Sequence, residues 1–378
     1  MRTTHCVRAG WLVGALGACI VLAGTAGAQS LNSERPGSLL MFPKVSCSGQ
    51  RDTVIQISNT GNMPDTLHCF YLNGAPGRNG RPLCTSTDFL ITLTKQQPTH
   101  WHVCTGRSPF TAMLVGNAAA TSDNIQFLDS AGLSPGNIPP VTDGFEGALV
   151  CAESDEEGTP MILNAVKGEA TIEGPGPDVS KYNGLAFQGS AAHSNGDDTL
   201  DLNGVEYAAC PAESRFNFIP AGQNDPVIEE IGNGGVCSVT TTQGCNPDLT
   251  KGAGCPGAET CLAGRSSVAN NITVLPCKLN FEAGTISNVA LNFSGTDEFE
   301  TVFSGSTTIS CWGTFTLAPP IIGAIASRFA TVEISAPAGS PFVAVGESFH
   351  VDSVGNTAAA SVNLITEDSD PSGQIRIY

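Results

Sequence analysis

The feature that most constrains the fold of this chain is the alternation of apolar and polar residues in many short runs, for example at residues 89–93 and 289–293. A period of two places successive side chains on opposite faces of a β-strand. No stretch of a dozen residues keeps the period of 3.6 that an amphipathic helix needs. The sequence therefore predicts an all-β protein.

Tight turns separate these runs. Six Asn-Gly dipeptides occur between residues 73 and 234, and both residue types tolerate the positive φ that short hairpins require. We therefore expect one or two antiparallel β-sandwiches with Greek-key or immunoglobulin-like connections. Besides 89–93, 289–293 and 309–317, the expected strands are 39–42, 53–58, 66–72, 148–152, 161–172, 205–209, 215–219, 272–281, 328–334, 342–345 and 360–365.

Residues 1–28 are typical of a secretory signal peptide. Arg2 and Arg8 precede an apolar stretch at residues 11–22, and Ala-Gly-Ala at 26–28 gives a small-residue cleavage site. Two alternatives are lipoprotein processing at Cys19 and a retained membrane anchor, although the apolar stretch is shorter than the ~20 residues of a span. No second apolar stretch of membrane length follows, so we expect no transmembrane span in the mature chain.

Cysteine usage favours an oxidising compartment. Of 14 cysteines, Cys6 and Cys19 lie in the predicted signal, and an even number remains, which predicts up to six disulfides. A Cys69–Cys84 bond could clip a long hairpin, and the last two cysteines could bridge strands. Several other pairings stay open. The candidates are Cys47, Cys69, Cys84, Cys104, Cys151, Cys210, Cys237, Cys245, Cys255, Cys261, Cys277 and Cys311.

Residues 221–270 differ from their surroundings. They are rich in glycine, poor in large apolar residues, and contain four cysteines within 25 positions. A segment with so little to bury needs covalent cross-links, so we expect a small disulfide-bonded insert. The spacing lacks paired C-x-x-C motifs and holds no histidine, which argues against zinc. The predicted organisation is a sandwich domain at 29–220, the insert, and a second sandwich domain at 271–378.

The net charge of −18 disfavours nucleic acid and anionic membranes as partners, because both attract lysine and arginine. The same charge suits a soluble exported protein or one that binds divalent cations. Carboxylates cluster at residues 153–157 and 367–370, and a third cluster contains Asp197, Asp198, Asp201 and Asn203. Oxygen ligands on turns suit Ca²⁺. A structural Ca²⁺ at the third cluster is therefore a hypothesis, with solvated acidic turns as the alternative.

The catalytic patterns that the sequence offers are weak. Residues 132–136 match G-x-S-x-G, but Pro135 follows the serine and has no N–H to serve as an oxyanion donor. His100, His102 and Cys104 would share one side of a strand, where they could hold copper or zinc. Oxidation of Cys104 to a disulfide would remove that ligand. We therefore expect no enzymatic activity.

Four segments of the sequence are similar to those of a known group of proteins. They are Gly-Ser-Leu-Leu-Met-Phe-Pro-Lys at 37–44, Asp-Thr-Val-Ile-Gln-Ile-Ser-Asn-Thr at 52–60, Gln-Gln-Pro-Thr-His-Trp at 96–101 and Lys-Gly-Glu-Ala at 167–170. Together they resemble an uncharacterised group of exported bacterial all-β proteins. The resemblance spans most of the mature chain and implies an exported, surface-associated β protein, without implying any activity.

These observations lead to three hypotheses. The first is a non-enzymatic structural, surface or adhesion-like protein, stabilised by disulfides and acting on an unidentified extracellular or cell-surface partner. The second is a Ca²⁺-dependent extracellular module that binds carbohydrate or another polymer. The third is a hydrolase with an unrecognised pair of carboxylates, since only their separation in space decides such a mechanism.

Overall fold

The computed structural model describes residues 31–107, 137–220 and 267–377, except 79, 176–177, 285–287, 326, 352–356 and 366–368. All its secondary structure is β, and nearly every strand pair is antiparallel, so the predicted all-β class is confirmed. No helix in the described part is long and apolar enough to cross a bilayer. The predicted signal peptide, the G-x-S-x-G segment and most of the predicted insert, with its four cysteines, lie outside the described residues.

The first sandwich is a ten-stranded sheet that folds over on itself. The sheet folds at the hairpin between β2 and β3, where only two residue pairs are in register, and a shared apolar core fills the space between the two layers. The inner layer contains β5 (Thr85–Leu93), β4 (Asp65–Asn73), β7 (Phe145–Ser154), β2 (Leu39–Ser48), β10 (Leu185–Phe187) and β1 (Leu31–Asn32). The outer layer contains β6 (Pro98–His102), β3 (Arg51–Asn59), β8 (Val166–Glu173) and β9 (Val179–Asn183).

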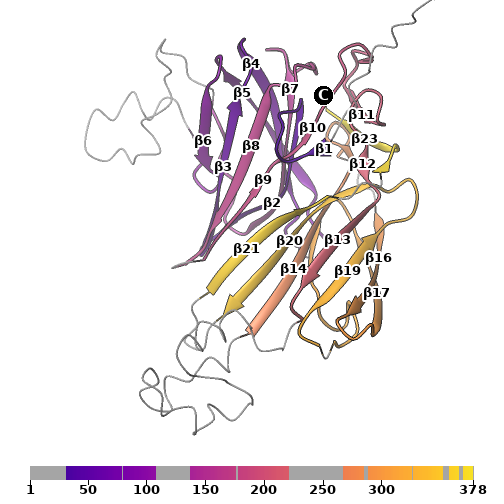
Figure 1. Ribbon diagram of the computed structural model, residues 1–378. Coiled ribbons are helices and arrows are strands. Elements are labelled where there is room, and N and C mark those ends of the chain that lie inside the picture. Colours follow the sequence, from indigo (N-terminus) through magenta and orange to yellow (C-terminus); the bar gives the residue numbers. More distant parts are fainter. Residues whose placement is uncertain are drawn as a thin grey trace, which may run out of the picture.

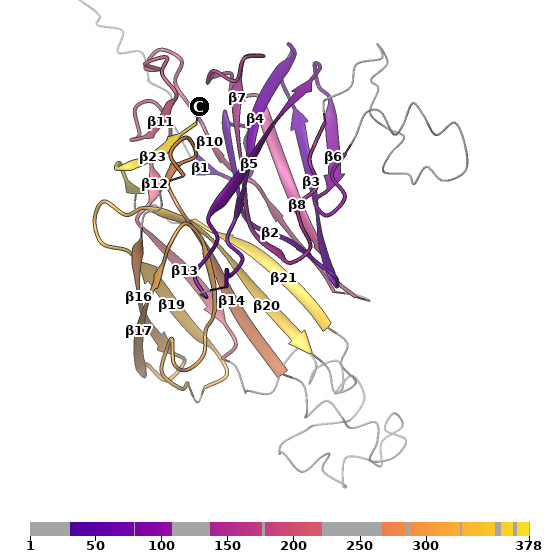
Figure 2. The same cartoon turned by 180° about the vertical axis from the view of Figure 1, so that it is seen from behind.

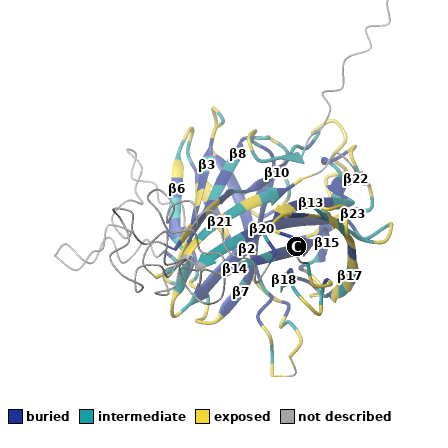
Figure 3. Cartoon of the chain, turned by 60° about the horizontal axis from the view of Figure 1, so that its bottom comes forward, coloured by how far each residue is buried: buried dark blue, intermediate teal, exposed yellow. Residues whose placement is uncertain are grey.

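The second sandwich consists of two four-stranded sheets with their own core. Figure 1 shows it below the first sandwich, and Figure 3 shows buried residues concentrated in the strands of both. One sheet contains β13 (Glu213–Phe218), β19 (Ala330–Ser335), β16 (Val289–Asp297) and β17 (Val302–Ile309). The other contains β18 (Gly313–Thr316), β14 (Ser267–Pro276), β20 (Phe342–Val351) and β21 (Thr357–Leu364).

Two small sheets connect the sandwiches. They lie above β13, β16 and β19 in both Figure 1 and Figure 2. The C-terminal strands return to pair with strands that precede residue 220, and the pair β15–β23 is parallel. Strand pairing therefore crosses the boundary expected at residue 220. The first small sheet contains β11 (Thr199–Leu202), β23 (Gly373–Arg376) and β15 (Lys278–Asn280), and the second contains β12 (Cys210–Pro211) and β22 (Ser369–Asp370).

The inner layer of the first sandwich is buried on both faces. Strands β2, β4 and β7 have almost no exposed residue. One face packs on the outer layer, and the other packs on side chains from the connecting region, including Trp312 and Ile375. Phe281 stacks on Phe70 with ring centroids 4.4 Å apart. The two halves of the chain therefore share a core.

Several expected strands needed correction. Residues 205–209 form a turn region instead of a strand, and the strand expected at 161–172 begins at Val166. The continuous strand expected at 309–317 is interrupted at residues 310–312, between β17 and β18. The interruption turns Trp312 into the core shared by the two sandwiches, where it is 4% exposed. Periodicity alone does not reveal such a break.

Eight of the candidate cysteines form four disulfides, but the expected pairings at Cys69–Cys84 and between the last two cysteines are wrong. Two bonds lie within the first sandwich, one joins it to the second sandwich, and one joins β12 of the small sheets to the residue that follows β14. The bonds are Cys47–Cys104, Cys69–Cys151, Cys84–Cys311 and Cys210–Cys277.

Candidate functional site

A β-bulge in β2 places a lysine at the junction of the two sandwiches. The pairing of β2 with β7 shifts register between Phe42 and Val45, and bulges of this kind re-aim side chains. The two residues within the bulge are Pro43 and Lys44. Trp312 of the second half donates its indole N–H to the Pro43 carbonyl at 2.7 Å. The bulge is thus fixed from the opposite side of the junction.

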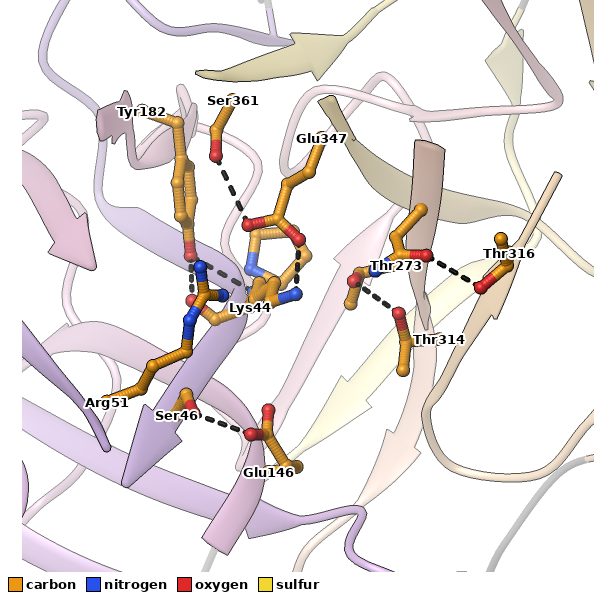
Figure 4. A network of polar contacts seen from close by, with 12 residues as sticks. Lys44, Ser46, Arg51, Glu146, Tyr182, Thr273, Thr314, Thr316, Glu347 and Ser361 are labelled. Atoms are coloured by element: carbon orange, nitrogen blue, oxygen red, sulfur yellow. Dashed lines mark hydrogen bonds and ion pairs between the residues drawn. The ribbon is translucent and has the colours of Figure 1, made fainter. Parts of the chain in front are cut away.

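Lys44 forms a buried ion pair with Glu347 of β20. Along β20, Val345 and Phe349 share a face with Glu347, and Val345 packs in the core of the first sandwich. The Lys44 ammonium contacts Glu347 Oε2, and Ser361 donates to Glu347 Oε1 at 3.4 Å. Figure 4 shows this arrangement. Lys44 is 5% exposed and Glu347 is fully buried.

The backbone of Lys44 is also held in place. Its N–H donates to the Tyr182 hydroxyl at 3.0 Å, and that hydroxyl donates in turn to the Lys44 carbonyl. Tyr182 is buried in the core of the first sandwich, so its ring cannot swing away without opening that core. The lysine therefore has little freedom to leave Glu347.

A second carboxyl group lies below the pair in Figure 4. Glu146 accepts a hydrogen bond from the Ser46 hydroxyl at 2.5 Å. Burial raises the pKa of Glu146, the Ser46 hydrogen bond and the Lys44 charge lower it, and the Glu347 charge raises it further. Arg51 lies over the Phe349 ring, with its guanidinium carbon 4.8 Å from the centroid. The junction therefore gathers charged groups away from water.

A separate pair of buried carboxyl groups, Asp65 and Glu153, lies at the start of β4 and the end of β7. Glu153 accepts backbone N–H donors from three consecutive residues, 163–165, at 2.6–2.9 Å. Asp65 is buried beside it and shares a hydrogen bond with the Glu153 carboxyl group. Burial and the nearby Glu153 carboxylate raise the pKa of Asp65 to about 8. The amide donors stabilise charge on Glu153, so Asp65 holds the proton at neutral pH.

The predicted Ca²⁺ residues occupy exposed turns and an edge strand. Asp197 and Asn203 each accept the backbone N–H two residues further along, as turn-forming side chains do. Asp201 accepts a hydrogen bond from Gln374 at 2.9 Å, and the side chain of Asp198 is exposed. Within the described ranges, no three His, Cys, Asp or Glu residues are grouped so that they could hold a metal ion. Calcium binding here stays a prediction.

The histidine–cysteine motif does not gather three ligands. Cys104 is bonded to Cys47, as the oxidised alternative expected. His102 contacts the Asp52 carboxylate at 3.1 Å. Between the histidines, Trp101 points into the core and donates its indole N–H to the Tyr71 hydroxyl at 2.6 Å. The motif is therefore part of an edge strand with one buried aromatic.

A pocket of about 540 Å³ lies at the far end of the second sandwich. It opens where β13 and β16 end and β19 begins, and its wall includes Asn217, Glu298, Phe329 and Thr331. Phe329 is 50% exposed, and Phe299 in the neighbouring turn is 74% exposed. Apolar rings beside hydrogen-bonding groups are typical of ligand sites.

Sequence reasoning missed the Lys44–Glu347 pair, and it placed Glu153 in an acidic cluster without its partner Asp65. Lys44 follows the apolar run 39–43, and Glu347 follows the apolar run 342–346. A charge inside such a run needs a partner when the strand is buried. That signal marks each residue as unusual, but it does not identify the partner 303 positions away.

Comparisons with known proteins identify no relative similar enough to indicate a fold or a function. No family model and no curated protein match the chain. It is similar to red sea bream transglutaminase, with 9% identity and a TM-score of 0.12 over 90% of this chain, but it spans only 31% of that protein. It is also similar to the lectin from Pleurotus ostreatus in complex with GalNAc, with 10% identity and a TM-score of 0.14 over 89% of this chain and 78% of that one. Both scores are too low to support a fold or a function.

Proposed function

We propose that this chain is an exported bacterial protein with a non-enzymatic, structural or adhesion-like role at the cell surface. The observation that supports the proposal is the way the two sandwiches are held together. Cys84–Cys311 joins them across 227 residues, Cys210–Cys277 fixes a small sheet to the second half of the chain, and the Lys44–Glu347 pair lies at the junction of the two sandwiches. Outside the cell, where disulfides persist, such links keep a protein folded.

The pocket at the far end of the second sandwich is the proposed contact surface. Loops at the end of a rigid sandwich commonly carry recognition. Phe299 and Phe329 expose apolar rings there, whereas large apolar side chains elsewhere in the described residues are mostly buried. We assign attachment to this end of the molecule.

The experiment is deletion of the gene in its own host, followed by measurement of surface attachment and of the protein in the cell-surface fraction. We expect attachment to fall and to return when the wild-type gene is restored. A double F299A/F329A variant should restore the surface protein but not attachment. Met63 is 63% exposed on the first sandwich, so M63A is the matched control and should restore both.

Two results would contradict the proposal. One is a deletion strain whose attachment, surface and matrix are all unchanged. The other is turnover of a chromogenic glycoside or ester by the purified protein, since the third hypothesis, a hydrolase, would then be favoured.

A further inference from the structure

We propose that Lys44 and Glu347 are joined by a covalent amide bond between Lys44 Nζ and Glu347 Cδ, formed after folding. Such a bond would join the two sandwiches covalently beside the Cys84–Cys311 disulfide, and it would resist reduction. The proposal does not depend on the protein's role at the cell surface.

The geometry brings the two reacting groups together. The Lys44 ammonium contacts Glu347 Oε2, so its nitrogen lies against the oxygen that is bonded to the carbon it would attack. The β2 bulge and the Tyr182 hydroxyl hold the lysine, while Ser361 holds the other carboxyl oxygen. Groups held in such an arrangement react as if at very high concentration, on the order of 10⁵ M or more.

The reaction needs no co-reactant. An ammonium and a carboxylate first exchange a proton to become an amine and a carboxylic acid. The amine nitrogen then forms a bond to Cδ, and the C–O bond to one carboxyl oxygen breaks. Two hydrogens from the original ammonium leave on that oxygen as water, and the third stays on the amide nitrogen. Nothing is oxidised or reduced.

Burial favours the amide over the ion pair. Two charges in a dry interior carry a large desolvation cost, which their attraction offsets only in part. A neutral amide removes both charges while keeping the connection. The side chain of Lys44 is 6% exposed and that of Glu347 is fully buried, so water has poor access for the reverse hydrolysis.

The experiment is mass spectrometry of the full-length protein purified from its host, fully reduced, alkylated and denatured. We expect the chain to be lighter than its sequence by one water. Trypsin does not cut after an acylated lysine, so the peptide that ends at Arg51 should contain an uncut Lys44. Tandem spectra should show it joined to the peptide that spans residues 329–376.

The chain contains its own control. Lys181 and Glu169 are in contact at 2.7 Å, but their side chains are 54% and 32% exposed. Both residues lie in the tryptic peptide 168–181, which should end with a cut after Lys181 and show no loss of water, whereas a linked Lys181 would extend it to Arg215. If these two residues were also linked, the loss of water would come from sample handling and the proposal would fail.

A variant tests the assignment further. K44R keeps the positive charge but has no amine to acylate, so its mass should match its sequence. Separate peptides with a cut at Lys44 in the folded wild-type protein would overturn the proposal outright, and that measurement needs no variant.

Discussion

At the scale of the residue, the molecule is unusual for the charged groups that it buries. Lys44, Glu347, Asp65 and Glu153 are each at most 5% exposed, although charged residues are rarely so buried. The free-energy cost of burying these groups is reduced in three different ways. Glu153 is held by backbone amides, the Lys44–Glu347 pair by mutual contact, and Asp65 by keeping its proton. Their effects therefore differ with pH.

The raised pKa of Asp65 predicts that the protein is less stable in alkali than in mild acid. Its pKa is raised from 3.8 to about 8, so the folded state binds a proton that the unfolded state has released. Stability should therefore fall as pH rises between these two values, by at most about 1.4 kcal/mol per pH unit. Urea unfolding at pH 5, 7 and 9 measures this loss.

The D65N variant tests the assignment. Asparagine cannot ionise, so the loss of stability between pH 5 and pH 8 should be much smaller than in the wild type. Glu156 is exposed, and E156Q serves as the control that should leave the slope unchanged. An equal slope in D65N and wild type would show that another group is responsible.

At the scale of the element, the loop between β4 and β5 connects the sandwiches by packing. It begins at Gly74, whose N–H donates to the Glu146 carbonyl at 2.8 Å, and it ends at Cys84, which is bonded to Cys311. The Trp312 ring lies directly against Gly74 and leaves no room for a side chain. The glycine is required for this close approach.

The G74A variant should lose about 1–3 kcal/mol of unfolding free energy, because its added methyl group would overlap the Trp312 ring. Gly49 is the matched control, since a methyl group there would meet no atom within 4 Å. G49A should change stability by less than about 0.5 kcal/mol. Thermal unfolding of both variants measures the two losses of stability. An equal loss in G74A and G49A would contradict the packing argument.

Elements with clear alternation could be predicted from the sequence. Strands such as β16 have one wet face, so their apolar residues recur with period two. The inner strands β2 and β4 are buried on both faces, and their apolar runs were still recognisable. The bulge at Pro43 and Lys44 was not predictable, because it depends on the register with a strand a hundred residues later. The break before Trp312 likewise depends on the partner surface.

At the scale of the whole molecule, non-local contacts decide the arrangement. Local reasoning paired Cys69 with Cys84, its neighbour in the sequence, but the strands bring Cys69 to Cys151 and Cys84 to Cys311. Spacing cannot reveal such pairs, because loop length costs little free energy compared with the packing that brings the strands together. The candidate site at Lys44 and Glu347 was unpredictable for the same reason.

This arrangement predicts that the two classes of disulfide have different effects. Cys84–Cys311 joins the sandwiches, whereas Cys47–Cys104 closes a loop within the first. Each double-alanine variant should lose about 2–5 kcal/mol. Only C84A/C311A should allow the sandwiches to unfold separately, because it removes the one disulfide between them among the described residues, whereas Cys210–Cys277 joins β12 of the small sheets to the residue that follows β14. Calorimetry should therefore show one transition for C47A/C104A and two for C84A/C311A. A single transition in both would mean that the shared core, with Phe70 against Phe281, is sufficient to keep the halves cooperative.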